Sequence, residues 1–262
     1  MKVPLSGKRN RLFYYYFNLP MTYIIRKRLL PAIIFTQTLI CISGIVANGN
    51  EPLAMFTAKR DSIERQMLYN GRVWRNLYSK IRGDQFLFSN DFVPGTVTIS
   101  NNLFKVDKLK YDIYNDELLI VTDKGIILQL NKEVTDRFSL DFPNKSYRFK
   151  RIDRDSTNDL NGYVNVLYEG NVSLFVRYKK SILLLAVDNK YDIFDQVQKI
   201  YLKKGNELFT VNSRRIFFNL LKDHKQQVKS FMRSGKIRVS KVDPESFVPV
   251  VKYYDNLLNQ NH

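Results

Sequence analysis

The chain is poor in the residues that build disulfides, metal centres and many catalytic sites. It contains one cysteine, Cys41, and two histidines, His224 and His262, in 262 residues. Cys41 lies in an apolar run near the N-terminus, so the rest of the chain can form no disulfide, thiolate metal site or cysteine nucleophile. Neither histidine stands in a metal-binding or nucleophile-activating motif. We therefore expect a protein that is not an enzyme and uses no cofactor.

Acidic residues are also scarce relative to basic ones. The chain has 42 Lys and Arg against 25 Asp and Glu, for a formal net charge of +17. Residues 1–47 hold seven of the basic residues and no acid, so the remaining 215 residues still carry about +10. A surplus of this size favours attraction to anionic surfaces. Nucleic acid is not expected as a partner, because aromatic and basic residues are not interleaved as they are in proteins that bind single strands.

The N-terminal region has the pattern of an export signal. Leu29 to Ala47 are 19 positions without a charge, preceded by the basic cluster Arg26 to Arg28 and followed by a polar stretch. This arrangement is typical of a secretory signal peptide with cleavage after Ala47. A retained membrane anchor is the alternative, since the run is close to the length of about 20 residues that spans a bilayer. A start at Met21 would give a signal of ordinary length.

Residues 72–211 read as a β domain. Short apolar runs recur between turns rich in Gly, Asn and Asp, which favours an antiparallel meander, sandwich or barrel. We assign 1–47 to the signal, 48–71 to an entry segment, 72–211 to the β domain and 212–262 to a helical segment packed on the sheet. The expected strands are 96–99, 108–114, 117–122, 126–130, 147–152, 163–168, 173–178, 182–187, 198–202 and 208–211.

Two helices are predicted at the C-terminal end. The first begins after Asn212 or Ser213 and stops at Gly235, and the second opens with Asp243-Pro244. A short segment at 237–239 is expected to extend a sheet edge. The first helix has an apolar face and a basic one. Its basic residues are candidates for docking to an anionic surface or partner: Arg214, Arg215, Lys222, Lys225, Lys229 and Arg233.

One polar loop carries oxygen donors at alternate positions, the spacing that a calcium loop uses. The residues are Asp153, Asp155, Thr157, Asp159 and Asn161. The pattern departs from an EF-hand, because Asn158 stands where glycine is needed and Val164 where the bidentate glutamate is needed. A polar connection between strands is the simpler interpretation.

Carboxylates near predicted turns leave one enzymatic alternative open. Asp112, Asp116, Glu117 and Asp123 could serve a glycan hydrolase that uses a pair of acids. Acids are also common in turns for conformational reasons. A lipid or small-ligand carrier is a further alternative.

Several segments resemble exported proteins of Bacteroidota that have no assigned activity. They are Trp74, Leu77-Tyr78 and Gly83-Asp84, Gly95 to Thr98, Leu109 to Tyr114, Glu117 to Ile120, Val166 to Gly170, Val176 to Lys179 and Tyr253 to Leu258. The resemblance implies a periplasmic or outer-membrane-associated location and supplies no site residues. Our hypothesis is a non-enzymatic protein that binds or scaffolds an envelope protein complex or an anionic membrane surface.

Overall fold

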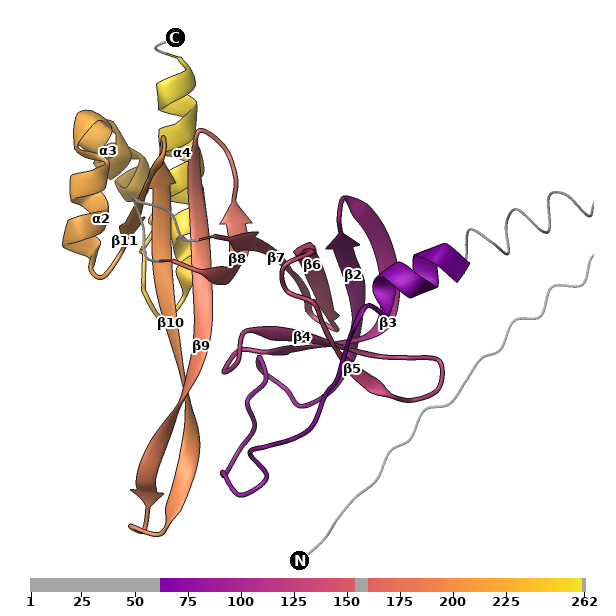
Figure 1. Cartoon of the computed structure of the whole chain (residues 1–262). Helices are drawn as coiled ribbons and strands as arrows, with labels where there is room; N and C mark the ends of the chain where they lie inside the picture. Colours follow the sequence, from indigo (N-terminus) through magenta and orange to yellow (C-terminus); the bar gives the residue numbers. More distant parts are fainter. Residues whose placement is uncertain (1–61, 154–159, 261–262) are drawn as a thin grey trace, which may run out of the picture. The chain divides into compact units, whose positions relative to one another are not determined.

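The computed structural model describes residues 62–153 and 160–260. Within them, eleven strands form one antiparallel sheet, followed by helices (Figure 1). The signal predicted for 1–47 lies outside this part of the chain. The strands are β1 (Gly71–Val73), β2 (Val93–Ile99), β3 (Asn102–Asp112), β4 (Glu117–Val121), β5 (Ile127–Leu130), β6 (Thr135–Phe142), β7 (Lys145–Ile152), β8 (Gly162–Tyr168), β9 (Val172–Val187), β10 (Tyr191–Lys204) and β11 (Glu207–Thr210).

The predicted fold class is confirmed: the protein is mainly β with C-terminal helices, and the sheet is open. The strand order is β1-β5-β4-β3-β2-β6-β7-β8-β9-β10-β11, so β2 pairs with both β3 and β6. The turn residues behave as their chemistry requires, since Asn101 and Asp116 adopt positive φ in the β2–β3 and β3–β4 hairpins. Residues 62–68, in the predicted entry segment, are helical and lead into β1.

The sheet curls strongly. In a flat sheet the four strand spacings from β3 to β8 would separate these strands by about 19 Å. Yet the ring centroids of Tyr111 on β3 and Tyr163 on β8 are 5.9 Å apart, and both rings pack edge-on against Phe138 of β6. Phe138 stacks in turn on Phe149 of β7 at 4.7 Å. This aromatic cluster fills the concave side of the sheet and helps to hold the curl.

The helical segment differs from the expectation in its detail. The first predicted helix is two α-helices, α2 (Arg214–Leu220) and α3 (Lys225–Ser234), joined by the short 3-10 turn η1 (Lys222–His224). The predicted ends are confirmed, because the Ser213 hydroxyl accepts a hydrogen bond from the Ile216 N–H and Gly235 caps α3. The second helix starts as the 3-10 turn η2 (Pro244–Phe247) and continues as α4 (Val248–Asn259).

Two strand predictions were wrong. Residues 237–239 form no strand; Val239 is instead buried in the core against which the helices pack. Residues 173–178 and 182–187 are not separate strands, because both belong to the single long strand β9. β9 pairs with β10 almost to its end, and that pairing supplies the hydrogen bonds that a break in the strand would lose.

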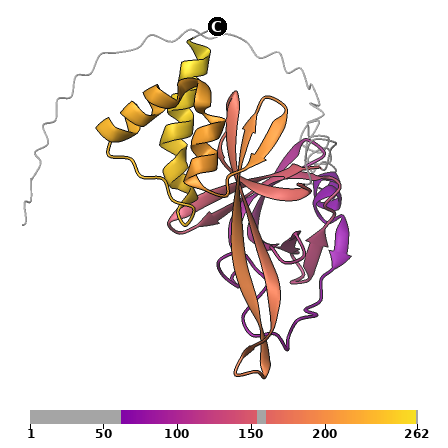
Figure 2. The ribbon, with the colours of Figure 1, turned by 90° about the vertical axis from the view of Figure 1, so that its left-hand side faces the viewer.

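The helices pack on the strands that follow the curl. α4 lies along β8 and β9, with α3 beside it (Figures 1 and 2). Asp255 of α4 is 4% exposed and accepts hydrogen bonds from the Val172 N–H and the Tyr168 hydroxyl, both at 2.8 Å. A side chain at Gly170 would come within 2.4 Å of that carboxylate, so glycine is needed in the β8–β9 turn. These contacts fix α4, against which α3 packs.

Candidate functional site

The predicted docking residues lie on one exposed helical surface. Arg214, Arg215, Lys222, Lys229 and Arg233 are exposed and Lys225 is half-buried. None of the six forms an ion pair with another residue in the described part of the chain. From 212 to 242 the sequence has nine basic residues and a single acid, Asp223. We call the six residues the basic face of α2–α3.

Apolar packing orients this face. Phe217, Leu221 and Val228 are fully buried, and the Phe217 ring meets Phe247 edge-on at 4.8 Å. Since these side chains face the sheet and α4, the basic residues between them in sequence are directed to water. The arrangement matches the two-sided pattern expected from the sequence, although the helix is broken at η1.

The only acid in this segment is already engaged by the fold. The Asp223 carboxylate accepts hydrogen bonds from the Tyr254 hydroxyl, at 2.7 and 2.9 Å, and from the Lys204 ammonium at 3.0 Å. Burial alone would raise the pKa of Asp223, but the hydrogen bonds from Tyr254 and Lys204 outweigh it and lower that pKa below its ordinary value. Asp223 therefore stays ionised and ties η1 to β10 and α4.

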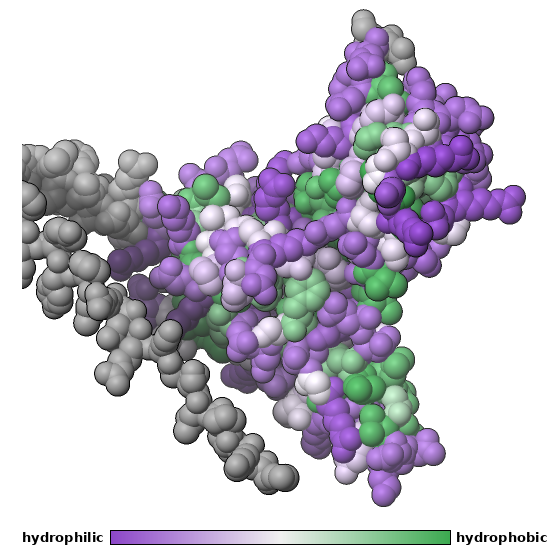
Figure 3. Space-filling model, turned by 180° about the vertical axis from the view of Figure 1, so that it is seen from behind, coloured by the Kyte–Doolittle hydropathy of each residue, from purple (hydrophilic) through white to green (hydrophobic). Residues whose placement is uncertain are grey.

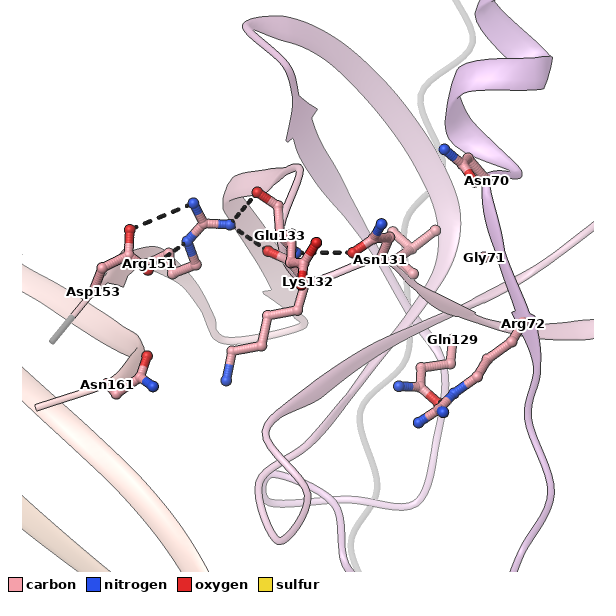
Figure 4. Close-up of a pocket in the computed structure, with 11 residues that line it drawn as sticks. Asn70, Gly71, Arg72, Gln129, Asn131, Lys132, Glu133, Arg151, Asp153 and Asn161 are labelled. Carbon is pink, nitrogen blue, oxygen red and sulfur yellow. Dashed lines mark hydrogen bonds and ion pairs between the residues drawn. The ribbon is translucent and has the colours of Figure 1, made fainter.

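A polar depression of about 640 Å³ lies between the start of β1, the β5–β6 turn and the end of β7 (Figure 4). Figure 4 shows the Arg151 guanidinium between Asp153 and the backbone of residues 132–133. Arg151 forms an ion pair with Asp153 at 3.0 Å and donates a hydrogen bond to the Glu133 carbonyl at 2.5 Å. On the opposite wall, Arg72 donates to the Gln129 side chain at 2.6 Å.

Two of the five calcium candidates, Asp153 and Asn161, line this depression. Asp155, Thr157 and Asp159 lie outside the described residues. Asp153 is committed to Arg151, which places a cation where a calcium ligand set would need only oxygens. Over residues 62–153 and 160–260, no group of three or more His, Cys, Asp or Glu side chains is placed to hold a metal ion.

Lys132, which lines the depression, belongs to a charged network centred on Asp116. The Asp116 carboxylate accepts hydrogen bonds from the Tyr111 hydroxyl and the Lys132 ammonium, both at 2.5 Å, and Arg177 lies 3.7 Å away. Burial, and then the adjacent Asp116 charge, hold the pKa of Tyr111 well above its ordinary value. Tyr111 is therefore a hydrogen-bond donor and not a base. Asp116 supports the curl of the sheet, since it also accepts from the Tyr163 N–H at 3.3 Å.

The remaining carboxylates considered for glycan hydrolysis also have partners. Asp112 is completely buried and accepts from the Gln85 and Asn115 side chains at 3.1 and 2.9 Å. Glu117 pairs with Arg72 at 3.3 Å, and Asp123 lies 3.7 Å from Arg65. Each acid thus contributes to a turn or an ion pair in the part of the chain that the structure describes.

The structure has a second concave surface that the sequence did not predict. It is a groove of about 560 Å³ on the outer face of β2, β6, β7 and β8, where Arg137, Arg148 and Lys150 lie among threonine and serine hydroxyls. Glu169 pairs with Lys150 and lies 3.8 Å from Arg137. The hydrogen bond from Lys150 lowers the pKa of Glu169, so this acid remains ionised and balances part of the positive charge. The groove was not found because β6 was not predicted.

None of the helices in the described residues is both long and apolar enough to cross a membrane.

Comparison of the chain with protein-family models, with curated proteins and with solved structures found no match. The resemblance to exported Bacteroidota proteins stays a prediction.

Proposed function

We propose that this chain is an exported, non-enzymatic binding or scaffolding protein of a bacterial envelope, which docks on an anionic surface through the basic face of α2–α3. The basic face carries the proposal. Its charges are directed outward by a buried apolar side, and they have no acidic partners among the described residues of the same segment.

The energetics of such a surface are favourable for peripheral binding. Each Lys or Arg held near an anionic membrane contributes about 1 kcal/mol, and the effect falls off within a Debye length. Several cations on one rigid surface therefore add up to useful affinity without a deep pocket. Export, the envelope location and the absence of catalysis remain parts of the proposal that rest on the sequence.

The proposal is tested by sedimentation of the purified protein with phospholipid vesicles, with and without anionic lipid. We expect binding only to the anionic vesicles. The triple variant Lys222→Glu, Lys229→Glu and Arg233→Glu should weaken that binding roughly 100-fold, at about 1 kcal/mol or more per reversed charge. The matched control reverses three exposed lysines on the hairpins of the sheet, Lys105, Lys108 and Lys124, and should weaken binding far less.

If the anionic surface belongs to an acidic protein instead of a membrane, a second experiment detects it. Crosslinking in native envelope fractions, read by mass spectrometry, should then recover a defined set of envelope proteins through the basic face. If the triple variant and the control behave alike in both assays, the basic face is not the docking surface and the proposal fails.

A further inference from the structure

The β9–β10 hairpin extends well beyond the rest of the sheet (Figure 1). β8 pairs with β9 only as far as Val176, and β11 pairs with β10 only from Tyr201 onward. Residues 177–199, which we call the arm, therefore form a two-stranded ribbon. On the β9 edge, the Lys180 N–H donates to the Ile113 carbonyl at 3.3 Å. On the β10 edge, the Arg82 N–H donates to the Asp192 carbonyl at 2.9 Å and the Phe194 N–H donates to the Arg82 carbonyl at 3.1 Å, which braces the middle of the ribbon. Beyond this brace the ribbon has no further strand neighbour among the described residues.

The arm contains a strained bulge. Tyr191 pairs with Val187 and Ile193 pairs with Leu183, so residues 184–186 of β9 together face the single residue Asp192. Leu185 adopts φ +51°, a conformation that bulky side chains rarely occupy. The Asp192 carboxylate holds it by accepting the Leu185 N–H at 2.9 Å. Bulges re-aim side chains, and strain maintained in this way often accompanies a binding role.

The bulge presents apolar side chains to water. Leu183, Leu184 and Leu185, the leucine knob, are 46%, 74% and 55% exposed. Figure 3 shows hydrophobic residues gathered on the arm, away from the helices. Single exposed leucines are common, but a contiguous exposed group on a projecting element marks an interaction site.

Charges of opposite sign lie before and after the knob along the chain. Lys179, near the root of the arm, lies four positions before Leu183, and Asp188, at the tip, lies four positions after Leu184. Both side chains are exposed. If two arms cross antiparallel about a two-fold axis at the knob, Lys179 of each copy faces Asp188 of the other. In that arrangement the knob meets its own copy, and Lys179 meets the tip that carries Asp188 beside Lys190, so each contact is repeated across the axis, as in an isologous interface.

A bilayer fits this element less well. Asp188 and Lys190 lie at the tip, beyond the leucines, and would have to enter the hydrocarbon ahead of them. A second copy leaves these charges at the rim of the contact, in water. We propose that two copies of this chain associate through their arms, leucine knob against leucine knob, with reciprocal Lys179–Asp188 pairs.

Sedimentation velocity of the purified protein over a range of concentrations tests the proposal. The parent should show a concentration-dependent dimer, and Leu184→Lys should remain a monomer where the parent is dimeric. Leu103→Lys, at a leucine 67% exposed on β3, is the matched control and should leave the dimer intact.

Exchanging the charges at Lys179 and Asp188 distinguishes the loss of ion pairs in the dimer from a loss of folding. Lys179→Glu or Asp188→Lys alone sets like charges against each other twice in the dimer and should raise its dissociation constant at least tenfold. Combining both changes in one chain should restore the parent value, an effect that loss of folding cannot produce. A parent that is monomeric at every concentration overturns the proposal, as does a double variant no better than the single ones. If the parent is monomeric throughout and Leu184→Lys loses vesicle binding, the knob is instead assigned to lipid.

Discussion

The helical segment and the arm differ in where their apolar residues lie. At the helical end, Phe217 and Val228 are completely buried, and every charged residue from 212 to 242 except Asp223 is basic. On the arm, Leu184 is 74% exposed and acidic and basic residues are mixed. The helices bury their apolar side within the chain and expose their basic residues to water. The arm leaves its leucines uncovered by the described part of the chain.

Shortening one apolar side chain in the helical segment and one in the arm tests this difference most directly. Phe217→Ala removes a fully buried ring that packs on Phe247, and should lower the free energy of unfolding by about 3–5 kcal/mol. Leu184→Ala should change the free energy of unfolding of the monomer by less than about 0.5 kcal/mol, because the side chain is in water. Urea unfolding of both variants at low protein concentration gives the two values. Equal losses would mean that the arm is packed in the monomer.

Acid titration probes the attachment of the helical end. The pKa of Asp223 is lowered in the folded state, so its stabilising contribution is complete above its unfolded pKa and is lost as pH falls through its folded value. Asp223→Asn should therefore lower stability by about 1 kcal/mol at neutral pH, after allowance for solvent screening at this partly exposed site. The difference from the parent should shrink as pH falls through the acidic range in which carboxylates take up protons. Stability curves that stay parallel through that range would show that ionisation of Asp223 does not matter.

The smallest effect is expected at the bulge. Leu185→Gly relieves a positive φ that leucine tolerates poorly, while glycine also gains freedom in the unfolded chain. We expect a net change within about 1 kcal/mol, together with slower amide hydrogen exchange at residues 184–192. The same substitution removes part of the knob and should weaken the dimer. Faster exchange across the arm would indicate that the Leu185 side chain, and not its backbone, holds the bulge.

The sequence predicted the class of fold but not the extent of every strand. Strands with clean apolar runs, such as β4 and β8, were found within a residue or two of their ends. β6 was missed, although Phe138 and Leu140 alternate inward along it, because Asp136, Arg137 and Asp141 made the segment look like a loop. β10 was found only near its root, since most of the strand lies in the arm, where burial does not impose a pattern.

Among the candidate sites, too, some could be predicted from the sequence and others could not. The basic face of α2–α3 could be predicted because helical periodicity separates apolar from basic residues within one local segment. The depression lined by Asp153, Asn161 and Arg72 could not, since it joins three distant parts of the chain. The leucine knob was predicted only as part of a strand, because the periodicity of a sequence does not show whether another element covers a given strand.

By itself the sequence determined the β-rich class, the helix caps at Ser213 and Gly235 and the sign of the helical surface, because each depends on residues a few positions apart. Tertiary structure alone decided the curl of the sheet, the contacts of Asp116 with Tyr111 and Lys132, and the exposure of Leu183 to Leu185. These features depend on which strands become neighbours. That choice is made by packing summed over the whole sheet, and no local pattern contains it.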